Sequence, residues 1–232
     1  MKTVRYAVMM FIVCSLSLMC ESDIRKVWET RKETLMKDTS VLRYYTFEGV
    51  VDSKSVVKDL SGKGGDLRYV PVKVSGKEIV DLQVVEGRML GKPAIRLDRG
   101  YYQGPGVEIK NKAFTAECWF RRKGPATEYP GSIWTILLCG GGGKGWALGL
   151  RGESGLEGQI SCVPGSVSDG RKRANKLAEA RDISIPLDSW QHAAFTWDGK
   201  EIFLYLNGVL VGRDKYDGEC EYVPAGSPLL IG

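Results

Sequence analysis

The chain has 232 residues, of which 43% are hydrophobic, and a formal net charge of +5. This length is ample for one sizeable hydrophobic core, and an all-β sandwich commonly takes this much chain as a single domain. The charge is modest and spread along the chain, without a basic stripe that alternates with aromatic residues, which argues against a nucleic acid as partner.

Residues 1–22 form a segment that predicts export from the cytoplasm. Lys2 and Arg5 supply a positive start, and an apolar stretch follows from Tyr6 to Cys20. This stretch is short for a bilayer span, so a cleaved signal peptide is favoured, with an uncleaved membrane anchor as the alternative. Lipidation at Cys20 is a further alternative, although the residue before it is not small. We therefore expect a secreted, periplasmic or cell-surface protein that meets a membrane only through this segment.

Residues 23–40 predict a helical tether between the export segment and the folded domain. Within Asp23–Lys37, Ile24, Val27, Trp28 and Leu35 recur at helical spacing among charged residues. This periodicity is typical of an amphipathic helix.

The most regular part of the sequence predicts three consecutive antiparallel strands, at Gln191–Trp197, Glu201–Leu206 and from Val209. Asp198-Gly199 and Asn207-Gly208 separate them, and such pairs tolerate the positive φ of a tight hairpin. Parallel strands would need long crossovers. The expected fold class is therefore all-β, an antiparallel two-sheet sandwich.

Other segments predict further strands between turn-forming residues. They are Val41–Phe47, Leu67–Val70, Phe114–Arg121, Trp134–Leu138, Trp146–Leu150 and Gln159–Val163. The glycine run Gly140–Gly143 predicts a hairpin loop, because apolar strands flank it on both sides. The basic segment Arg171–Arg181 predicts a short helix within a surface insertion.

The run from Trp190 to Gly212, W-x-H-x-A-x-x-W-D-G-K-x-I-x-L-Y-L-N-G-V-L-V-G, resembles the hairpins of laminin-G-like, concanavalin-A-like jelly rolls. Tyr44–Gly49, Phe114–Arg121 and Gly145–Leu150 agree with this resemblance. It implies a jelly-roll domain over residues 41–232, in a class that mostly binds glycans or partner proteins. Fold analogy alone does not choose between these roles.

The same resemblance implies that the domain is truncated at its C-terminus. The sequence stops at Ser227–Gly232, which predicts a strand of L-x-I-G type. In similar domains a further acidic strand follows this one, so we expect the source gene to continue in frame beyond Gly232.

Strand alternation divides the expected core from the outer face of one sheet, since successive side chains point to opposite sides. The outward set holds the candidate ligand-binding residues Trp119, Glu117, Phe203, Tyr205 and His192. Flat rings cover the apolar faces of sugars while polar groups bind the hydroxyls. This pattern favours a non-catalytic carbohydrate-binding module whose partner is a polysaccharide or glycan.

Two alternatives remain open for the function. One is a protein interaction or adhesion domain of a larger surface protein, in which other segments cover the same aromatic face. The other is a glycoside hydrolase-like domain, which needs two carboxylates on either side of the scissile bond. The E-x-D-x-E run that glucanases of this fold use is missing, and the acidic cluster Asp217–Glu221 contains a glycine typical of a loop. We therefore expect no enzyme activity.

Calcium is the cofactor that the resemblance implies. Asp59, Ser61 and Asp66 in a glycine-rich loop are the candidate ligands, because hard cations prefer oxygen donors on flexible loops. A plain structural turn is the alternative for this loop.

The cysteines outside the export segment are Cys118, Cys139, Cys162 and Cys220. In an oxidising compartment they would form two disulfides by one of three pairings. The alternative is that they are buried thiols.

Overall fold

A computed structural model describes residues 23–73, 81–89, 91–98, 100–107, 109, 113–124, 133–141, 144–152, 154–161, 175–216 and 227–232. Contacts between residues divide the chain into two compact units, one built from Met1–Asp66 with Leu82–Arg96 and the other from Leu67–Asp81 with Leu97–Gly232. The described residues include no helix that combines the length and the apolar character needed to cross a membrane. The predicted export segment and Cys20 lie outside the described residues.

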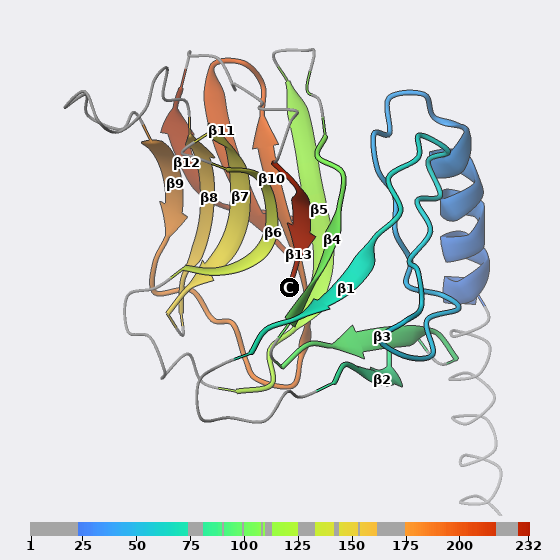
Figure 1. The fold of residues 1–232 in the computed structure, drawn as a ribbon. Coiled ribbons are helices and arrows are strands. Elements are labelled where there is room, and N and C mark those ends of the chain that lie inside the picture. The colour runs from blue at the N-terminus through green and yellow to red at the C-terminus, as the bar shows by residue number, and fades with distance from the viewer. Residues whose placement is uncertain are drawn as a thin grey trace, which may run out of the picture. The chain divides into compact units, whose positions relative to one another are not determined.

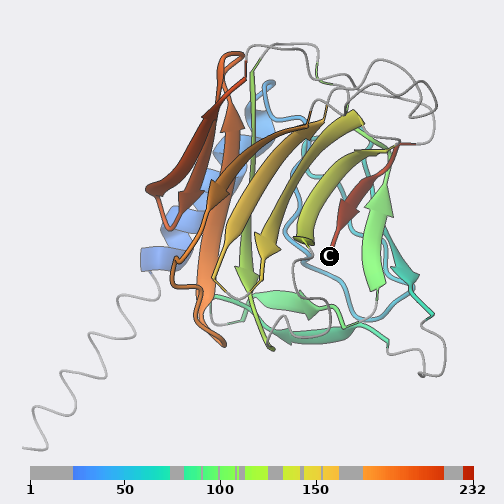
Figure 2. The same cartoon turned by 90° about the vertical axis from the view of Figure 1, so that its left-hand side faces the viewer.

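The second unit contains a seven-stranded antiparallel sheet, seen face-on in Figure 2. Its strands are, in spatial order, β1 (Arg68–Pro71), β4 (Gly100–Gly104), β13 (Leu229–Ile231), β6 (Ile133–Gly141), β7 (Lys144–Arg151), β8 (Leu156–Ser161) and β9 (Asn175–Ala180). β6 and β7 pair antiparallel up to Gly141↔Lys144, which agrees with the predicted hairpin. The last strand, β13, pairs with both β4 and β6.

The second sheet of this unit has four antiparallel strands in the order β12 (Val209–Lys215), β11 (Glu201–Leu206), β10 (Trp190–Trp197) and β5 (Phe114–Arg121). These strands confirm the predicted meander, and Figure 1 shows the two sheets of this unit as two layers. The predicted fold class, an antiparallel two-sheet sandwich, is therefore correct.

The hydrophobic core lies between the two sheets. Phe195 of β10 and Trp146 of β7 stack with ring centroids 6.5 Å apart, and Phe114 of β5 lies 5.5 Å from each ring. Gly158 of β8 completes this contact, because a Cβ atom there would lie 2.3 Å from the Phe195 ring and 2.6 Å from Leu204. The two sheets therefore pack closely enough that one position facing the core has to be glycine.

The hairpin turns follow the predicted chemistry, with one shift of register. Asn207 and Gly208 both have positive φ, 51° and 80°, and join Leu206 to Val209. This is the type I′ geometry that Asn-Gly favours. In the preceding hairpin Gly199 has a φ of 93°, whereas Asp198 caps the turn by accepting N–H bonds from Lys200 and Glu201. The turn is centred on Gly199-Lys200, one residue later than predicted.

The predicted helix at Arg171–Arg181 is wrong over its second half, which forms strand β9. Residues 162–174 lie outside the described residues. β9 pairs with β8 from Leu156↔Ala180 to Ser161↔Asn175, and Ala178 and Ala180 are buried in alternation. Helix propensity of residues such as Ala, Leu and Lys is a weak preference, and pairing with β8 outweighs it.

The edges of the two sheets meet where β9 contacts β12. A Cβ atom at Gly212 of β12 would lie only 2.7 Å from the carbonyl oxygen of Glu179 on β9. We call this close approach of Gly212 and Glu179 the seam.

The first unit contains the helix over residues 23–37 and the two-stranded sheet of β2 (Gln83–Glu86) and β3 (Pro93–Arg96). The helix confirms the prediction for Asp23–Lys37. Trp28 on this helix lies under Lys92, whose Nζ is 3.6 Å from the ring centroid and 2.8 Å from Glu29 Oε1. A cation–π contact and an ion pair therefore join the helix to the segment before β3.

The predicted first strand at Val41–Phe47 is wrong, because this segment belongs to no sheet. Its central residue, Tyr44, donates its N–H to Asp59 Oδ1 at 3.1 Å and accepts the N–H of Leu60 at 2.8 Å. A side chain thus replaces part of the strand ladder. Phe47 then turns the chain with a φ of 57°, a conformation that strand residues do not adopt.

Cys118 and Cys139 are free thiols, whereas Cys162 and Cys220 lie outside the described residues. Cys139 is fully buried, and its Sγ lies 3.2 Å from the N–H of Val107. Burial, with a smaller contribution from Glu117, raises the pKa of the Cys118 thiol to about 12. Cys139 matches the buried-thiol alternative, whereas Cys118 is a free thiol of intermediate exposure.

Candidate functional site

The four-stranded sheet places the predicted ligand-binding residues on one face. β5 and β10 pair Trp119 with His192 and Glu117 with Ala194, and β10 and β11 pair Ala194 with Tyr205 and Thr196 with Phe203. Alternation puts all of these side chains on the side opposite to the buried Phe195 and Leu204. We call this side the outer face of the four-stranded sheet.

Trp119, His192 and Glu117 form one contact group on the outer face. Trp119 is 48% exposed, and the centroid of its ring lies 5.0 Å from that of the His192 ring at an angle of 44°. His192 Nε2 lies 3.5 Å from Glu117 Oε2. The group therefore combines an accessible aromatic surface with hydrogen-bonding groups of two kinds.

A side-chain network that sequence reasoning missed holds His192 in place. Asn207 accepts the N–H of His192 through Oδ1 at 2.9 Å and donates its own N–H to the His192 carbonyl at 2.8 Å. Its Nδ2 donates to Oε1 of the buried Gln191 at 2.6 Å, and Gln191 donates to Ser189 at 3.0 Å. A polar residue on the core side of β10 was the signal that could have revealed this network.

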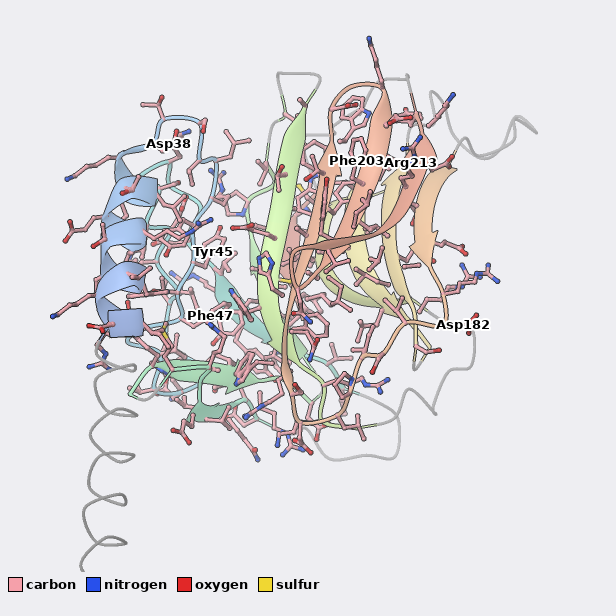
Figure 3. All side chains as sticks on the ribbon, turned by 180° about the vertical axis from the view of Figure 1, so that it is seen from behind. Asp38, Tyr45, Phe47, Asp182, Phe203 and Arg213 are labelled. Carbon is pink, nitrogen blue, oxygen red and sulfur yellow. The ribbon has the colours of Figure 1, made fainter. Side chains whose placement is uncertain are left out.

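A β-bulge in β12 arranges the other end of the outer face. Leu204 opposes Gly212 while Tyr205 opposes Leu210, so Val211 is the additional residue. The bulge brings Arg213 opposite Phe203, and Figure 3 shows these two residues side by side on neighbouring strands. One row of outward side chains crosses all four strands, in the order Glu117, Ala194, Tyr205 and Leu210. Leu210, at the end of this row, is 46% exposed.

The predicted calcium ligands lie in one loop of the first unit, but other groups already occupy their oxygens. Asp59 accepts the N–H groups of Tyr44, Ser61 and Gly65, and Arg43 lies 3.7 Å from its Oδ2. The N–H of Asp59 binds Asp66 Oδ1.

The remaining donors of this loop are engaged in the same way. Lys58 pairs with Asp66 at 2.6 Å, and the Ser61 hydroxyl donates to the Leu42 carbonyl. Within the described residues no cluster of three or more His, Cys, Asp or Glu suits a metal ion. This arrangement fits a structural turn better than a calcium site, since the ion would have to displace these donors. Calcium binding here stays a prediction, which a calorimetric titration can check.

The outer face of the seven-stranded sheet carries a second polar cluster, which sequence reasoning also missed. Arg151 Nη1 of β7 lies 2.9 Å from Glu157 Oε2 of β8 and 2.5 Å from Glu179 Oε1 of β9. Glu179 also pairs with Arg181 at 2.6 Å. Glu157 is only 2% exposed, and burial raises its pKa although Arg151 acts in the opposite direction. We call this set the Arg151 cluster.

Comparison with known families agrees with this architecture. The model of a laminin G-like family, described as the concanavalin A-like lectin/glucanases superfamily, matches residues 98–232. The chain belongs to this superfamily. The matched region lies in the second unit, which carries both sheets. No curated protein matches the sequence significantly.

Solved structures of this superfamily's fold share little sequence with the chain. Domain 4 of AbnA, a GH43 extracellular arabinanase from Geobacillus stearothermophilus solved in complex with arabinotriose, is 17% identical with a TM-score of 0.55, and the match covers 82% of each chain.

Two toxin domains show the same fold over less than half of their length. The binding domain of botulinum neurotoxin serotype G is 16% identical with a TM-score of 0.52, and that of serotype C1 is 13% identical with a TM-score of 0.54. The match covers 82% and 84% of this chain but only 42% and 43% of the toxin domains. At these identities the likeness establishes the fold alone.

Proposed function

We propose that this superfamily member is a non-catalytic, extracytoplasmic carbohydrate-binding domain that holds a glycan on the outer face of the four-stranded sheet. The observation that carries the proposal is the exposed Trp119 ring beside His192 and Glu117. An aromatic ring covers the C–H surface of a sugar, while a carboxylate and an imidazole bind its hydroxyl groups.

The geometry of the carboxylates supports binding without cleavage. Glycoside hydrolysis needs two carboxylates on either side of the scissile bond, at a separation that sets the stereochemical outcome. Glu117 faces an imidazole, and its cross-strand neighbour is Ala194. The carboxylates of Glu157 and Glu179 both pair with one guanidinium nitrogen of Arg151, so both are engaged in ion pairs.

Export of the domain is supported by the charge and apolarity of residues 1–22. The arabinanase domain of similar fold comes from an extracellular protein. Fractionation of the native host cells, followed by N-terminal sequencing of the exported chain, tests both the location and the cleavage of the segment.

The direct test is isothermal titration of the full chain against a glycan panel, with Trp119→Ala as the variant. Loss of the exposed ring should weaken binding by about tenfold or more, since an aromatic contact contributes about 1 kcal/mol beyond its buried area. Trp119→Phe should retain part of the affinity. Leu187→Ala is the matched control, because Leu187 is a similarly exposed apolar residue in a loop.

Two outcomes would contradict the proposal. Release of reducing sugars by the purified chain would show that the domain is catalytic. Absence of binding to every glycan at millimolar concentration would favour the protein interaction alternative.

A further inference from the structure

Ala194 has a smaller side chain than its neighbours on the outer face of the four-stranded sheet. This residue points outward between Glu117 on one neighbouring strand and Tyr205 on the other, with His192 and Thr196 before and after it on β10. All four neighbours are larger than alanine, and Ala194 is only 7% exposed although it lies on the outer side. We call this position, bounded by these four residues, the Ala194 seat.

The seat has the lateral dimensions of a single sugar ring. Adjacent strands are about 4.8 Å apart, so the strands that carry Glu117 and Tyr205 are separated by about 10 Å. Along β10, His192 and Thr196 mark its two ends. Thr196 is held to Thr115 of β5 by a hydroxyl hydrogen bond of 3.1 Å, which fixes one end of the seat.

The two sides of the seat differ in chemistry. On the β5 side lie the Glu117 carboxylate and, beside it, the His192 imidazole, which bind hydroxyl groups. Tyr205 lies on the β11 side, and Leu210 lies beyond it on β12. The exposed Leu210 is on the outer face because the bulge at Val211 keeps it opposite Tyr205. A sugar edge made only of hydroxyl groups would lose hydration against Leu210 without gaining a hydrogen bond.

We propose that the Ala194 seat selects a sugar that carries a methyl-terminated substituent, such as an acetamido group or a C6 methyl, directed toward Tyr205 and Leu210. The inference rests on the proposed function and deepens it by naming the class of sugar. Burial of one methyl group against these side chains accounts for about a fourfold preference over the matched sugar without it.

The test measures the dissociation constants of the full chain for matched sugar pairs. N,N′,N″-Triacetylchitotriose differs from cellotriose only at C2 of each ring, where an acetamido group replaces the hydroxyl, and N-acetylgalactosamine differs from galactose in the same way. In the pair whose stereochemistry fits, the acetamido sugar should bind about fourfold more tightly or better. Leu210→Ser should reduce this ratio to about one while the affinity for the plain sugar changes little.

Val209→Ser is the matched control for Leu210→Ser. Val209 lies on the same hairpin and is even more exposed, at 63%, but it pairs with Leu206, whose side chain points to the core side. Its substitution should leave the acetamido preference unchanged. Ala194→Val should weaken both members of a pair, because it fills the seat, and thermal unfolding of each variant checks that the fold is retained.

The outcomes separate this inference from the proposed function. Equal affinities within a binding pair, or a preference that survives Leu210→Ser, would overturn the selection of methyl-bearing sugars while carbohydrate binding stands. If only sugars without a methyl group bind in the glycan panel, the selection of methyl-bearing sugars would also be wrong. If no glycan binds at all, the proposed function fails and this inference fails with it.

Discussion

The two sheets of the second unit present outer faces that differ in how their polar groups are used. On the four-stranded sheet, Glu117 and His192 lie 3.5 Å apart, beside a tryptophan that is about half exposed. On the seven-stranded sheet, Glu157 is buried and shares Arg151 with Glu179 at hydrogen-bonding distances. Both faces combine carboxylates with a cation or an imidazole, yet their geometry is suited to different tasks.

The difference shows why charged residues alone do not mark a binding face. Alternating charges link Glu157, Arg151, Glu179 and Arg181 across three neighbouring strands, so these groups satisfy one another. The Trp119 group has an exposed aromatic residue and a longer contact, 3.5 Å, between His192 and Glu117. Substitutions on the first face should therefore change binding, and those on the second should change stability.

The largest effect on stability is expected in the core between the two sheets, where Gly158 leaves no space for a larger side chain. Gly158→Val places side-chain atoms within 3 Å of Phe195 and Leu204, and overpacking of this kind should lower the free energy of unfolding by about 3 kcal/mol. Urea unfolding measures the change. Gly124→Ala is the control, because no atom lies within 4 Å of its added Cβ. A near-native stability of Gly158→Val would mean that the two sheets leave room for a side chain at this position.

Removal of the central cation from the Arg151 cluster tests the structural role of the second face. Arg151→Ala leaves the buried Glu157 carboxylate without its partner, and the free energy of unfolding should fall by about 3 kcal/mol. The double variant Arg151→Met, Glu157→Leu should recover much of this loss, since an apolar pair replaces the buried charges. Unchanged stability of the single variant would show that the cluster is not structural, and the comparison of faces would then fail.

The pH dependence of stability sharpens the same point. Because burial raises the pKa of Glu157 above its ordinary value in the folded state, the folded chain binds this proton more tightly than the unfolded chain. The contribution of Glu157 to stability therefore falls as the pH rises from its pKa in the unfolded chain through its pKa in the folded chain. Glu157→Gln removes the titration, so its stability relative to the native chain should increase between about pH 4 and about pH 7. Urea unfolding at both values measures this, and a constant or decreasing relative stability would contradict it.

The smallest effect on stability is expected for Glu117→Ala on the first face. Glu117 is about half exposed and its contact with His192 is long, so the free energy of unfolding should change by less than about 1 kcal/mol. Glycan affinity should nevertheless fall, as measured by titration with the same panel. A large loss of stability with unchanged affinity would reverse the roles assigned to the two faces.

Local chemistry made much of the second unit predictable. The turn at Asn207-Gly208 depends on residues that tolerate positive φ, and the alternation in Glu201–Leu206 fixes which side chains reach the core. The same alternation predicts that Trp119 and His192 lie on one face, as they do. These features depend on neighbours in sequence or across one hairpin, which a single sequence displays.

Features that depend on distant partners were not predictable in this way. Segment Val41–Phe47 joins no sheet, and Asp59 accepts the N–H of Tyr44 in place of a strand partner. The spacing of these residues gives no sign of this contact. Segment Asn175–Ala180 is a strand only because β8 pairs with it. Glu157 alternates with apolar residues and could have been assigned to an outer face, but its burial depends on the cluster that β7 and β9 complete.

The seam at Gly212 also bears on how the molecule behaves at high concentration. β12 ends its sheet, and the outermost strand of a sheet offers unpaired backbone groups onto which another chain can add. Here the bulge at Val211 interrupts the regular row of these groups, and Arg213, Asp214 and Lys215 follow with charged side chains. The close approach of Gly212 to Glu179 leaves no room there for a foreign strand. This edge is thereby protected against fibre-like growth from molecule to molecule, whichever ligand the neighbouring face accepts.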